Sequence, residues 1–297
     1  MRLFFLLLIL QAFESVSAQP LSHLYFGQTP PDSTPKLFAP EELMKPGGLF
    51  AITRIAFSPD GKECFFSGPI DRSYTGTRMY NTKFENNKWS KHEIVSFFQG
   101  NSCRQPYFSA DGNTLYFSSN KNGTSDIWKV DRTSHGWGTP QVLSEPVNSS
   151  SYDGKYNVIK DGTIYFESNR SGGLGGTDIW CLLSKKNKKE AELINLSKTI
   201  NSSSDDVDPT VAPDGKYMIF SRNYDDLYVA FRTRKKWSSP INMNQIYPGI
   251  NTQEQEYAPT ISPDGKYLFF TRVADGGLHW VSTKYINKKR AVQINTK

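Results

Sequence analysis

The amino-acid sequence predicts an all-β fold, a β-propeller built from four-stranded antiparallel blades. Three observations lead to this prediction. The chain repeats with a period near 50 residues, an Asp-Gly dipeptide separates two strand-like runs in every repeat, and the third run carries an aromatic residue. Such a period with four strands per unit is typical of propeller blades. It is too long for one coil of a β-solenoid and too short for a sandwich domain.

The turns of the inner hairpins set the register of the repeat. The Asp of each Asp-Gly pair is Asp60, Asp111, Asp161, Asp214 and Asp264, so the intervals are 51, 50, 53 and 50 residues. Glycine at such a turn tolerates the positive φ that a tight hairpin needs. Because Asp recurs at a turn position, we expect its carboxylate to support its own turn through hydrogen bonds to the backbone.

Two further strands follow each hairpin. The third strand carries an aromatic residue in register, and we expect these rings to pack between blades: Tyr80, Trp128, Trp180, Tyr228 and Trp280. A more polar fourth strand is expected over residues 89–95, 137–143, 191–196 and 237–243.

The closing strand of the propeller has two candidates. Residues 34–39 resemble a fourth strand without a repeat of their own, so we expect them to complete the last blade. Pairing of the N- and C-terminal strands then closes the ring and removes open edges. Residues 290–295 also resemble a fourth strand. Five blades are therefore predicted, and a degenerate sixth blade is the alternative.

The N-terminus has the layout of a secretory signal peptide. Met1 and Arg2 precede an apolar run over residues 3–10, and small residues at 16–18 form a cleavage site before Gln19. We expect residues 1–18 to be removed and residues 19–297 to form a single propeller domain, periplasmic or extracellular. No later segment is apolar enough to be a transmembrane segment. Export argues against nucleic acid or a nucleotide cofactor, despite a net charge of +6.

The repeat sequences resemble a known family. SPDG at residues 58–61 and 262–265, DIW at 126–128, and ESNRSGGLGGTDIW at 167–180 resemble the WD40-like PD40 repeats of TolB-type propellers. Residues 25–31 and 35–40 resemble an exported bacterial branch of that family. The resemblance implies a propeller fold and, as for TolB itself, partner binding in the periplasm. It also implies an alternative, because other proteins with this repeat are lyases acting on oligosaccharides.

Two sets of charged residues recur on one face. Carboxylates stand eight residues before three of the turn aspartates, and arginines follow the second strand of the same repeats: Asp153, Asp206 and Glu256, with Arg170, Arg222 and Arg272. We expect these six residues to meet near the mouth of the central channel. One interpretation is ion pairs that join neighbouring blades. The other is a polar funnel that binds a ligand or a chain end.

The opposite face is expected to be basic. It carries Lys185, Lys186, Lys188, Lys189, the triplet 234–236 and the triplet 288–290. These charges favour solubility, or docking of a basic face on an anionic surface. Cys64 and Cys181 lie in strand patterns and are expected to be buried, whereas Cys103 lies in a loop and is the candidate free thiol. No metal site or cofactor is predicted.

These observations predict an exported, non-catalytic binding or scaffold propeller of the cell envelope that recognises a protein or glycan partner. No catalytic residue is assigned, because the four histidines are scattered and no nucleophile arrangement is recognisable. The alternative function is a carbohydrate-active enzyme, a glycoside hydrolase or polysaccharide lyase. It would use Asp153, Asp206 and Glu256 at the central funnel.

Overall fold

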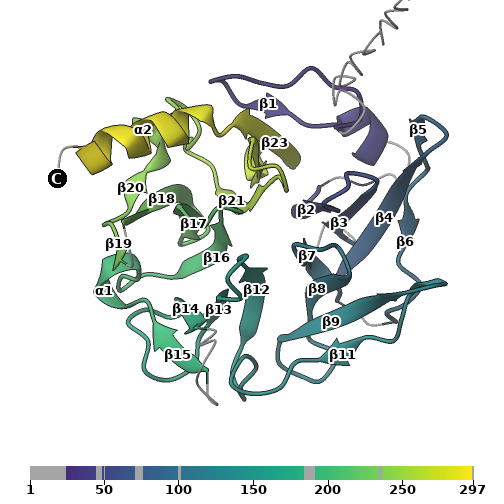
Figure 1. Cartoon of the computed structure of the whole chain (residues 1–297), viewed down its shortest axis with the longest axis horizontal. Coiled ribbons are helices and arrows are strands. Elements are labelled where there is room, and N and C mark those ends of the chain that lie inside the picture. The colour runs from purple at the N-terminus through teal and green to yellow at the C-terminus, as the bar shows by residue number, and fades with distance from the viewer. Residues whose placement is uncertain are drawn as a thin grey trace, which may run out of the picture.

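The computed structural model describes residues 25–44, 49, 51–70, 76–99, 102–183, 191–233 and 236–295. Their strands form five antiparallel sheets arranged around a central axis (Figure 1). The all-β propeller is therefore confirmed with five blades, and the described residues form no sixth sheet. The predicted signal peptide, residues 1–18, lies outside the described residues.

Each blade runs from the channel outward in chain order, and the blades are numbered 1 to 5 from the N-terminus. The inner strands are β2 (Arg54–Phe57), β7 (Arg104–Phe108), β12 (Asp153–Val158), β16 (Asp206–Val211) and β21 (Glu256–Ile261). The second strands are β3 (Glu63–Pro69), β8 (Thr114–Ser119), β13 (Ile164–Ser168), β17 (Tyr217–Arg222) and β22 (Tyr267–Arg272). The third strands are β4 (Thr77–Glu85), β9 (Asp126–Thr133), β14 (Asp178–Leu183), β18 (Asp226–Thr233) and β23 (Gly277–Ser282).

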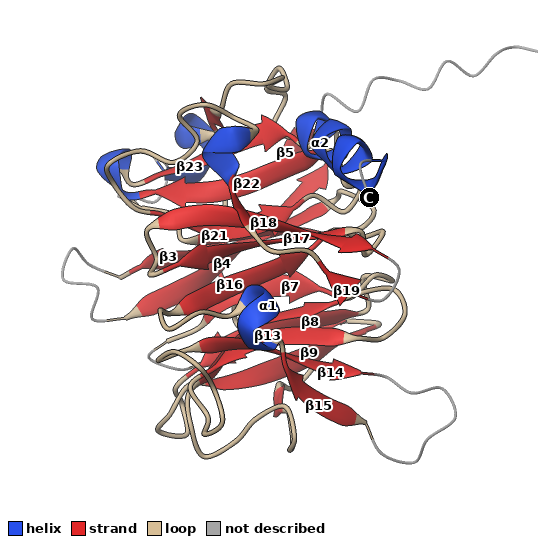
Figure 2. Ribbon diagram, turned by 90° about the vertical axis from the view of Figure 1, so that its left-hand side faces the viewer, coloured by secondary structure: helices blue, strands red, loops and turns tan. Residues whose placement is uncertain are grey.

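The outer strands are short and in three blades are split in two. They are β5 (Lys88–Trp89) with β6 (Glu93–Ile94), β10 (Gly136–Trp137) with β11 (Gln141–Val142), β15 (Glu192–Asn195), and β19 (Lys236–Trp237) with β20 (Ile241–Asn242). Short helical segments lie at the periphery, as the side view shows (Figure 2). They are Pro40–Met44, α1 (Ser197–Ile200), Met243–Gln245 and Val273–Asp275. No helix among the described residues is long and apolar enough to cross a membrane.

The N-terminal strand closes the ring. β1 (Lys36–Leu37) pairs antiparallel with β23, with Lys36 opposite Trp280, and confirms the expected closing strand. The expectation of a strand over residues 290–295 was wrong, because these residues belong to α2 (Lys284–Asn295). β1 pairs with the outer edge of β23, so that edge has no backbone hydrogen-bonding groups left for a second closing strand. Ile286 instead anchors the helix in the apolar cluster of blades 4 and 5.

The Asp-Gly turns have the expected geometry. In every turn the glycine has a positive φ, between 68° at Gly61 and 85° at Gly162. Asp60 Oδ1 accepts hydrogen bonds from the Lys62 amide at 3.0 Å and from the Ser58 hydroxyl at 2.6 Å. The other four turn aspartates accept the same backbone bond, from residues 113, 163, 216 and 266. Their structural role is confirmed.

The third-strand aromatic rings pack as expected between blades. Trp280, for example, contacts Phe38 and Phe269 at ring-centroid distances of 5.0 Å and 5.8 Å. These rings belong to a cluster that includes Ile55 and Phe57 of blade 1. Burial of this apolar surface joins the last blade to the first.

Four inner strands contain a β-bulge that the sequence did not predict. Its residue has a left-handed backbone: Gln105, Lys155, Asp208 and Ala258, with φ of 62°, 49°, 60° and 54°. The bulge directs each backbone N–H to a side chain of the preceding blade. The acceptors are Ser67 Oγ, Gln105 Oε1, Glu167 Oε2 and Asp208 Oδ2, at 3.3, 3.2, 2.6 and 3.0 Å. These buried hydrogen bonds offset a conformational cost of about 1–2 kcal/mol per residue.

Candidate functional site

The six predicted funnel residues form three separate ion pairs. Each carboxylate begins an inner strand. Arg222 and Arg272 are the last residues of the neighbouring second strands, and Arg170 follows the end of its second strand by two residues. The distances are 2.6 Å from Arg170 Nη2 to Asp153 Oδ1, 2.7 Å from Arg222 Nε to Asp206 Oδ1, and 2.8 Å from Arg272 Nε to Glu256 Oε1. All three carboxylate side chains have an exposed fraction of 0%.

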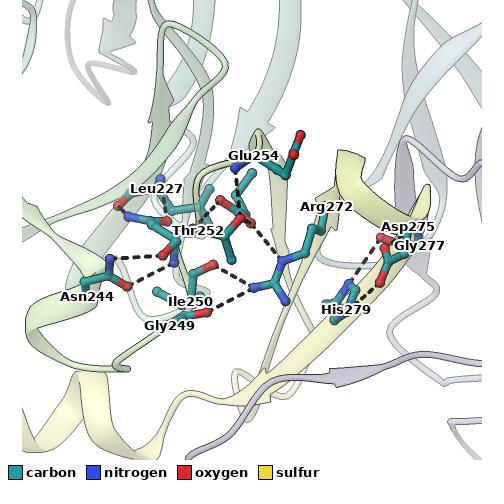
Figure 3. Close-up of polar contacts among 12 residues, drawn as sticks. Leu227, Asn244, Gly249, Ile250, Thr252, Glu254, Arg272, Asp275, Gly277 and His279 are labelled. Atoms are coloured by element: carbon teal, nitrogen blue, oxygen red, sulfur yellow. Dashed lines mark hydrogen bonds and ion pairs between the residues drawn. The ribbon is translucent and has the colours of Figure 1, made fainter.

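The pairs also fix the loops that join the blades. Glu256 accepts hydrogen bonds from the backbone and hydroxyl of Thr252, at 2.9 Å and 2.8 Å. Arg272 Nη2 donates to the carbonyls of Gly249 and Ile250, so one guanidinium holds both ends of the loop (Figure 3). Asp206 and Asp153 accept the equivalent bonds from Ser202 and Ser149.

An asparagine completes this device in each of the three loops. Asn148, Asn201 and Asn251 use the side-chain amide to bond both the N–H and the C=O of a third-strand residue, at distances of 2.8–3.0 Å. The repeated unit is therefore Asn-Ser/Thr followed by a carboxylate four residues later. The polar side chains of this unit form hydrogen bonds with one another and with the backbone of the loop and the third strand. This arrangement favours the interpretation of the funnel residues as connections between blades.

Burial alters the acid strength of one of these groups. It raises the pKa of Asp206 above its ordinary value, against the opposing effect of hydrogen bonds from Arg222 and Ser202. Ligand binding by the six funnel residues stays a prediction.

A second charged cluster lies inside the channel, which sequence reasoning missed. Asp208 of blade 4 forms an ion pair with Lys155 of the neighbouring blade 3 and, across the channel at 4.0 Å, with Arg54 of blade 1. Glu167 accepts a hydrogen bond of 2.5 Å from Tyr152. Arg54, Lys155, Asp208 and Glu167 are at most 5% exposed. Burial raises the pKa of Glu167, and the neighbouring Asp208 adds to the shift.

The sequence did contain a signal for this ring. Arg54, Gln105, Lys155, Asp208 and Ala258 each stand six residues before a turn aspartate. The residue six positions before each turn aspartate therefore lines the channel. The residue eight positions before it, on which the predicted funnel was based, lies at the junction between blades.

A cavity opens where the channel reaches the face of the Asp-Gly turns, called here the turn face. Its volume is about 300 Å³, and all five inner strands contribute to its lining. The walls are largely apolar and include Phe57, Tyr107, Phe108, Ile159 and Phe269. Polar side chains also line it, among them Asn157, Thr210 and Thr260 from three successive blades.

A basic depression lies on the turn face between blades 3 and 4. Its volume is about 580 Å³, and it is lined by Lys160, Lys216, Arg232 and Arg290 with Asp161 and Asp214, so the formal charge is 4 − 2 = +2. Arg290 comes from α2, so the C-terminal basic triplet reaches this face from a helix. Arg290 Nε is shielded from solvent and has no hydrogen-bond partner within the described residues. Residues 184–190 and 234–235, with the other predicted lysines, lie outside the described residues.

The structure does not distinguish Cys103 from the other two cysteines. Cys64, Cys103 and Cys181 are all free and buried. Burial raises the pKa of the Cys181 thiol to about 11 and that of the other two further. Among the residues that the structure describes, no three His, Cys, Asp or Glu side chains are grouped to hold a metal ion.

Comparisons with known proteins address the fold. No protein-family description and no curated protein matches the chain. Solved structures do match. TolB from Acinetobacter baumannii is 16% identical, with a TM-score of 0.47, over 78% of this chain and 54% of that one. The chain thus spans about half the length of that TolB.

Two other similar structures have different descriptions. The periplasmic gluconolactonase PpgL of Pseudomonas aeruginosa is 13% identical with a TM-score of 0.46, over 74% of this chain and 64% of that one. Kuenenia stuttgartiensis hydrazine synthase is 14% identical with a TM-score of 0.50, over 79% and 37%. TolB propellers are thus among the similar structures, as the repeat resemblance led us to expect. At these identities the likeness concerns the fold alone.

Proposed function

We propose that the chain is an exported binding propeller of the cell envelope, and that its turn face recognises an anionic protein or glycan partner. Its mature form begins at Gln19 and holds one propeller. The observation that carries the proposal is the basic depression, where four cationic side chains surround only two carboxylates. Charges in a hollow between low-dielectric walls attract an anionic partner more strongly than the same charges on a flat surface.

Local pairing leaves cations available in the depression. Asp214 is 2.8 Å from Lys216 Nζ and partly neutralises it. Lys160 and Arg290 have no carboxylate partner within the described residues. A partner carboxylate, phosphate or sulfate would supply the acceptor that Arg290 Nε lacks. Arginine suits this role because its guanidinium presents several donors in a fixed geometry.

The burial of the predicted funnel carboxylates argues against their use as catalytic groups. A glycoside hydrolase needs two carboxyl groups that contact the scissile bond, one of them as a proton donor. Asp153, Asp206 and Glu256 are fully buried and are occupied by arginine and by loop hydroxyls. No observation among the described residues favours the carbohydrate-active alternative.

The test is binding of a defined polyanion to residues 19–297. Poly-L-glutamate and polygalacturonate serve as probes for a protein-like and a glycan-like partner, at two salt concentrations. We expect salt-dependent binding of at least one probe, because exposed charge pairs weaken as ions screen them. Arg290→Glu should weaken binding by about fivefold or more.

Lys198→Glu is the matched control. Lys198 is exposed on α1, in the segment that joins blades 3 and 4 on the opposite face. Equal weakening by both variants would show that net charge alone governs binding and would refute the proposed surface. Absence of binding by both probes at low salt would refute the proposal itself.

A further inference from the structure

The channel cavity on the turn face has the composition of a small-molecule site. We propose that it binds a monocarboxylate whose body is a single apolar ring system. The proposal goes beyond recognition of a macromolecular partner. The cavity adjoins the basic depression and shares Lys160 with it, but its polar residues Asn157, Thr210 and Thr260 do not line the depression. Its volume of about 300 Å³ is at the lower end of the range for ligand pockets.

Hydrogen-bond donors are free among the residues that line the cavity. Asn157 uses its Oδ1 to accept from the Val211 amide at 3.2 Å, which leaves its NH₂ group for a ligand. Thr260 Oγ1 accepts from Arg54 Nε at 3.1 Å, so its own proton is directed elsewhere. Thr210 Oγ1 makes no hydrogen bond within the described residues. Three successive blades thus offer donors to one ligand group.

The charges around the cavity favour an anionic group. Its lining contains one cation, Lys160, and no Asp or Glu. Behind Thr260 lies the guanidinium of Arg54, 1% exposed. Its Nη1 is 4.0 Å from Asp208 Oδ1, beyond hydrogen-bond distance, and neither Nη1 nor Nη2 has a hydrogen-bond partner within the described residues. Its hydrogen bond to Thr260 polarises that hydroxyl toward an acceptor in the cavity. A carboxylate provides two acceptor oxygens for this set of donors.

The walls specify the rest of the ligand. Phe57, Phe108 and Phe269 supply aromatic faces, and Ile159, Val211 and Ile261 supply aliphatic ones. Aromatic rings pack favourably against such walls in offset or edge-to-face arrangements. A flat ring with one short carboxylate arm therefore matches the apolar walls and the polar set together.

The test measures binding of indole-3-acetate and 4-phenylbutyrate by isothermal titration calorimetry, beside their neutral amides. We expect one-to-one binding of at least one acid, tighter than its amide. Thr210→Val preserves shape and removes a hydroxyl that has no internal bond, so it should weaken the acid by about tenfold without loss of stability. Ala110 is exposed at the rim of the cavity. The larger side chain in Ala110→Trp should block the cavity and abolish binding.

Ser118→Ala is the matched control. Ser118 Oγ is also buried and without a hydrogen-bond partner among the described residues, but it lies outside the cavity. Its removal should leave ligand affinity unchanged. The proposal is overturned if neither acid saturates at millimolar concentration, if the amides bind as tightly as the acids, or if Ala110→Trp leaves binding intact while circular dichroism shows a native fold. Polyanion binding should be unaffected by Thr210→Val, which separates this test from that of the proposed partner surface.

Discussion

Removal of one funnel carboxylate should destabilise the fold rather than abolish a binding function. Asp206 accepts hydrogen bonds from the Ser202 amide at 2.6 Å, the Ser202 hydroxyl at 2.8 Å and Arg222 Nε at 2.7 Å. Asp206→Ala removes all three and leaves a charged guanidinium without its main acceptor. Loss of one partner of a buried pair costs about 3–5 kcal/mol.

The lower end of that range applies here. The Arg222 side chain is 24% exposed, so water replaces part of the lost interaction, and its Nη2 keeps the Ile200 carbonyl at 3.1 Å. We therefore expect a destabilisation of about 3 kcal/mol. At roughly 2–4 °C per kcal/mol for a domain of this size, Tm should fall by about 6–12 °C.

Thermal unfolding by circular dichroism measures this change in a double-mutant cycle with Arg222→Ala. The two single variants should both be destabilised, and their effects should be non-additive by about 1–3 kcal/mol, because each removes the same contact. A Tm within about 2 °C of wild type for Asp206→Ala would refute the structural interpretation. Loss of partner binding at unchanged Tm would then assign the pair to a ligand site.

Three further predictions concern other parts of the propeller. Burial raises the pKa of Glu167 above its ordinary value of 4.5, so the folded state holds this proton more tightly than the unfolded state. The contribution of Glu167 to the free energy of unfolding should therefore decrease as pH rises above 4.5. Urea unfolding should show that the stability of Glu167→Gln increases relative to that of wild type over the same pH range. Gly175→Ala should lower Tm by several degrees, since its Cβ would lie 2.0 Å from the Ser204 carbonyl oxygen, whereas Gly138→Ala meets only contacts of 3.2 Å or more. The three buried cysteines should be inert to a thiol reagent at pH 8 in the native protein and all react in guanidinium chloride; rapid native labelling of any one would contradict its burial.

The repeat made most of the fold predictable. Asp-Gly turns at a regular interval fix where each hairpin reverses, and the period fixes how many hairpins there are. The closing strand was predictable from residues 34–39, because a propeller with five hairpins and four outer strands lacks one strand. The prediction for the C-terminal residues was wrong, because a short polar segment with alternating apolar residues is compatible with either a strand or a helix. Only occupation of the β23 edge by β1 decides between them.

The candidate sites were predictable only in part. Pairing of Asp206 with Arg222 follows from strand register, and the structure places them directly opposite one another. The channel ring was not recognised, because the bulges at Gln105 and Lys155 put residues without turn propensity into a left-handed backbone. The cavity has no local signature at all. Its lining comes from five strands far apart in sequence, and α2 brings Arg290 to the turn face from an unexpected element.

The most direct test concerns which face of the propeller is used. Hydrogen-exchange mass spectrometry of residues 19–297, with and without the polyanion that binds, reports protection peptide by peptide. We expect protection in peptides covering the turns at Asp161 and Asp214 and in α2, with the blade-joining loops at residues 148–153, 201–206 and 251–256 unchanged. Protection confined to those loops would contradict a turn-face site and would place binding at the funnel mouth instead.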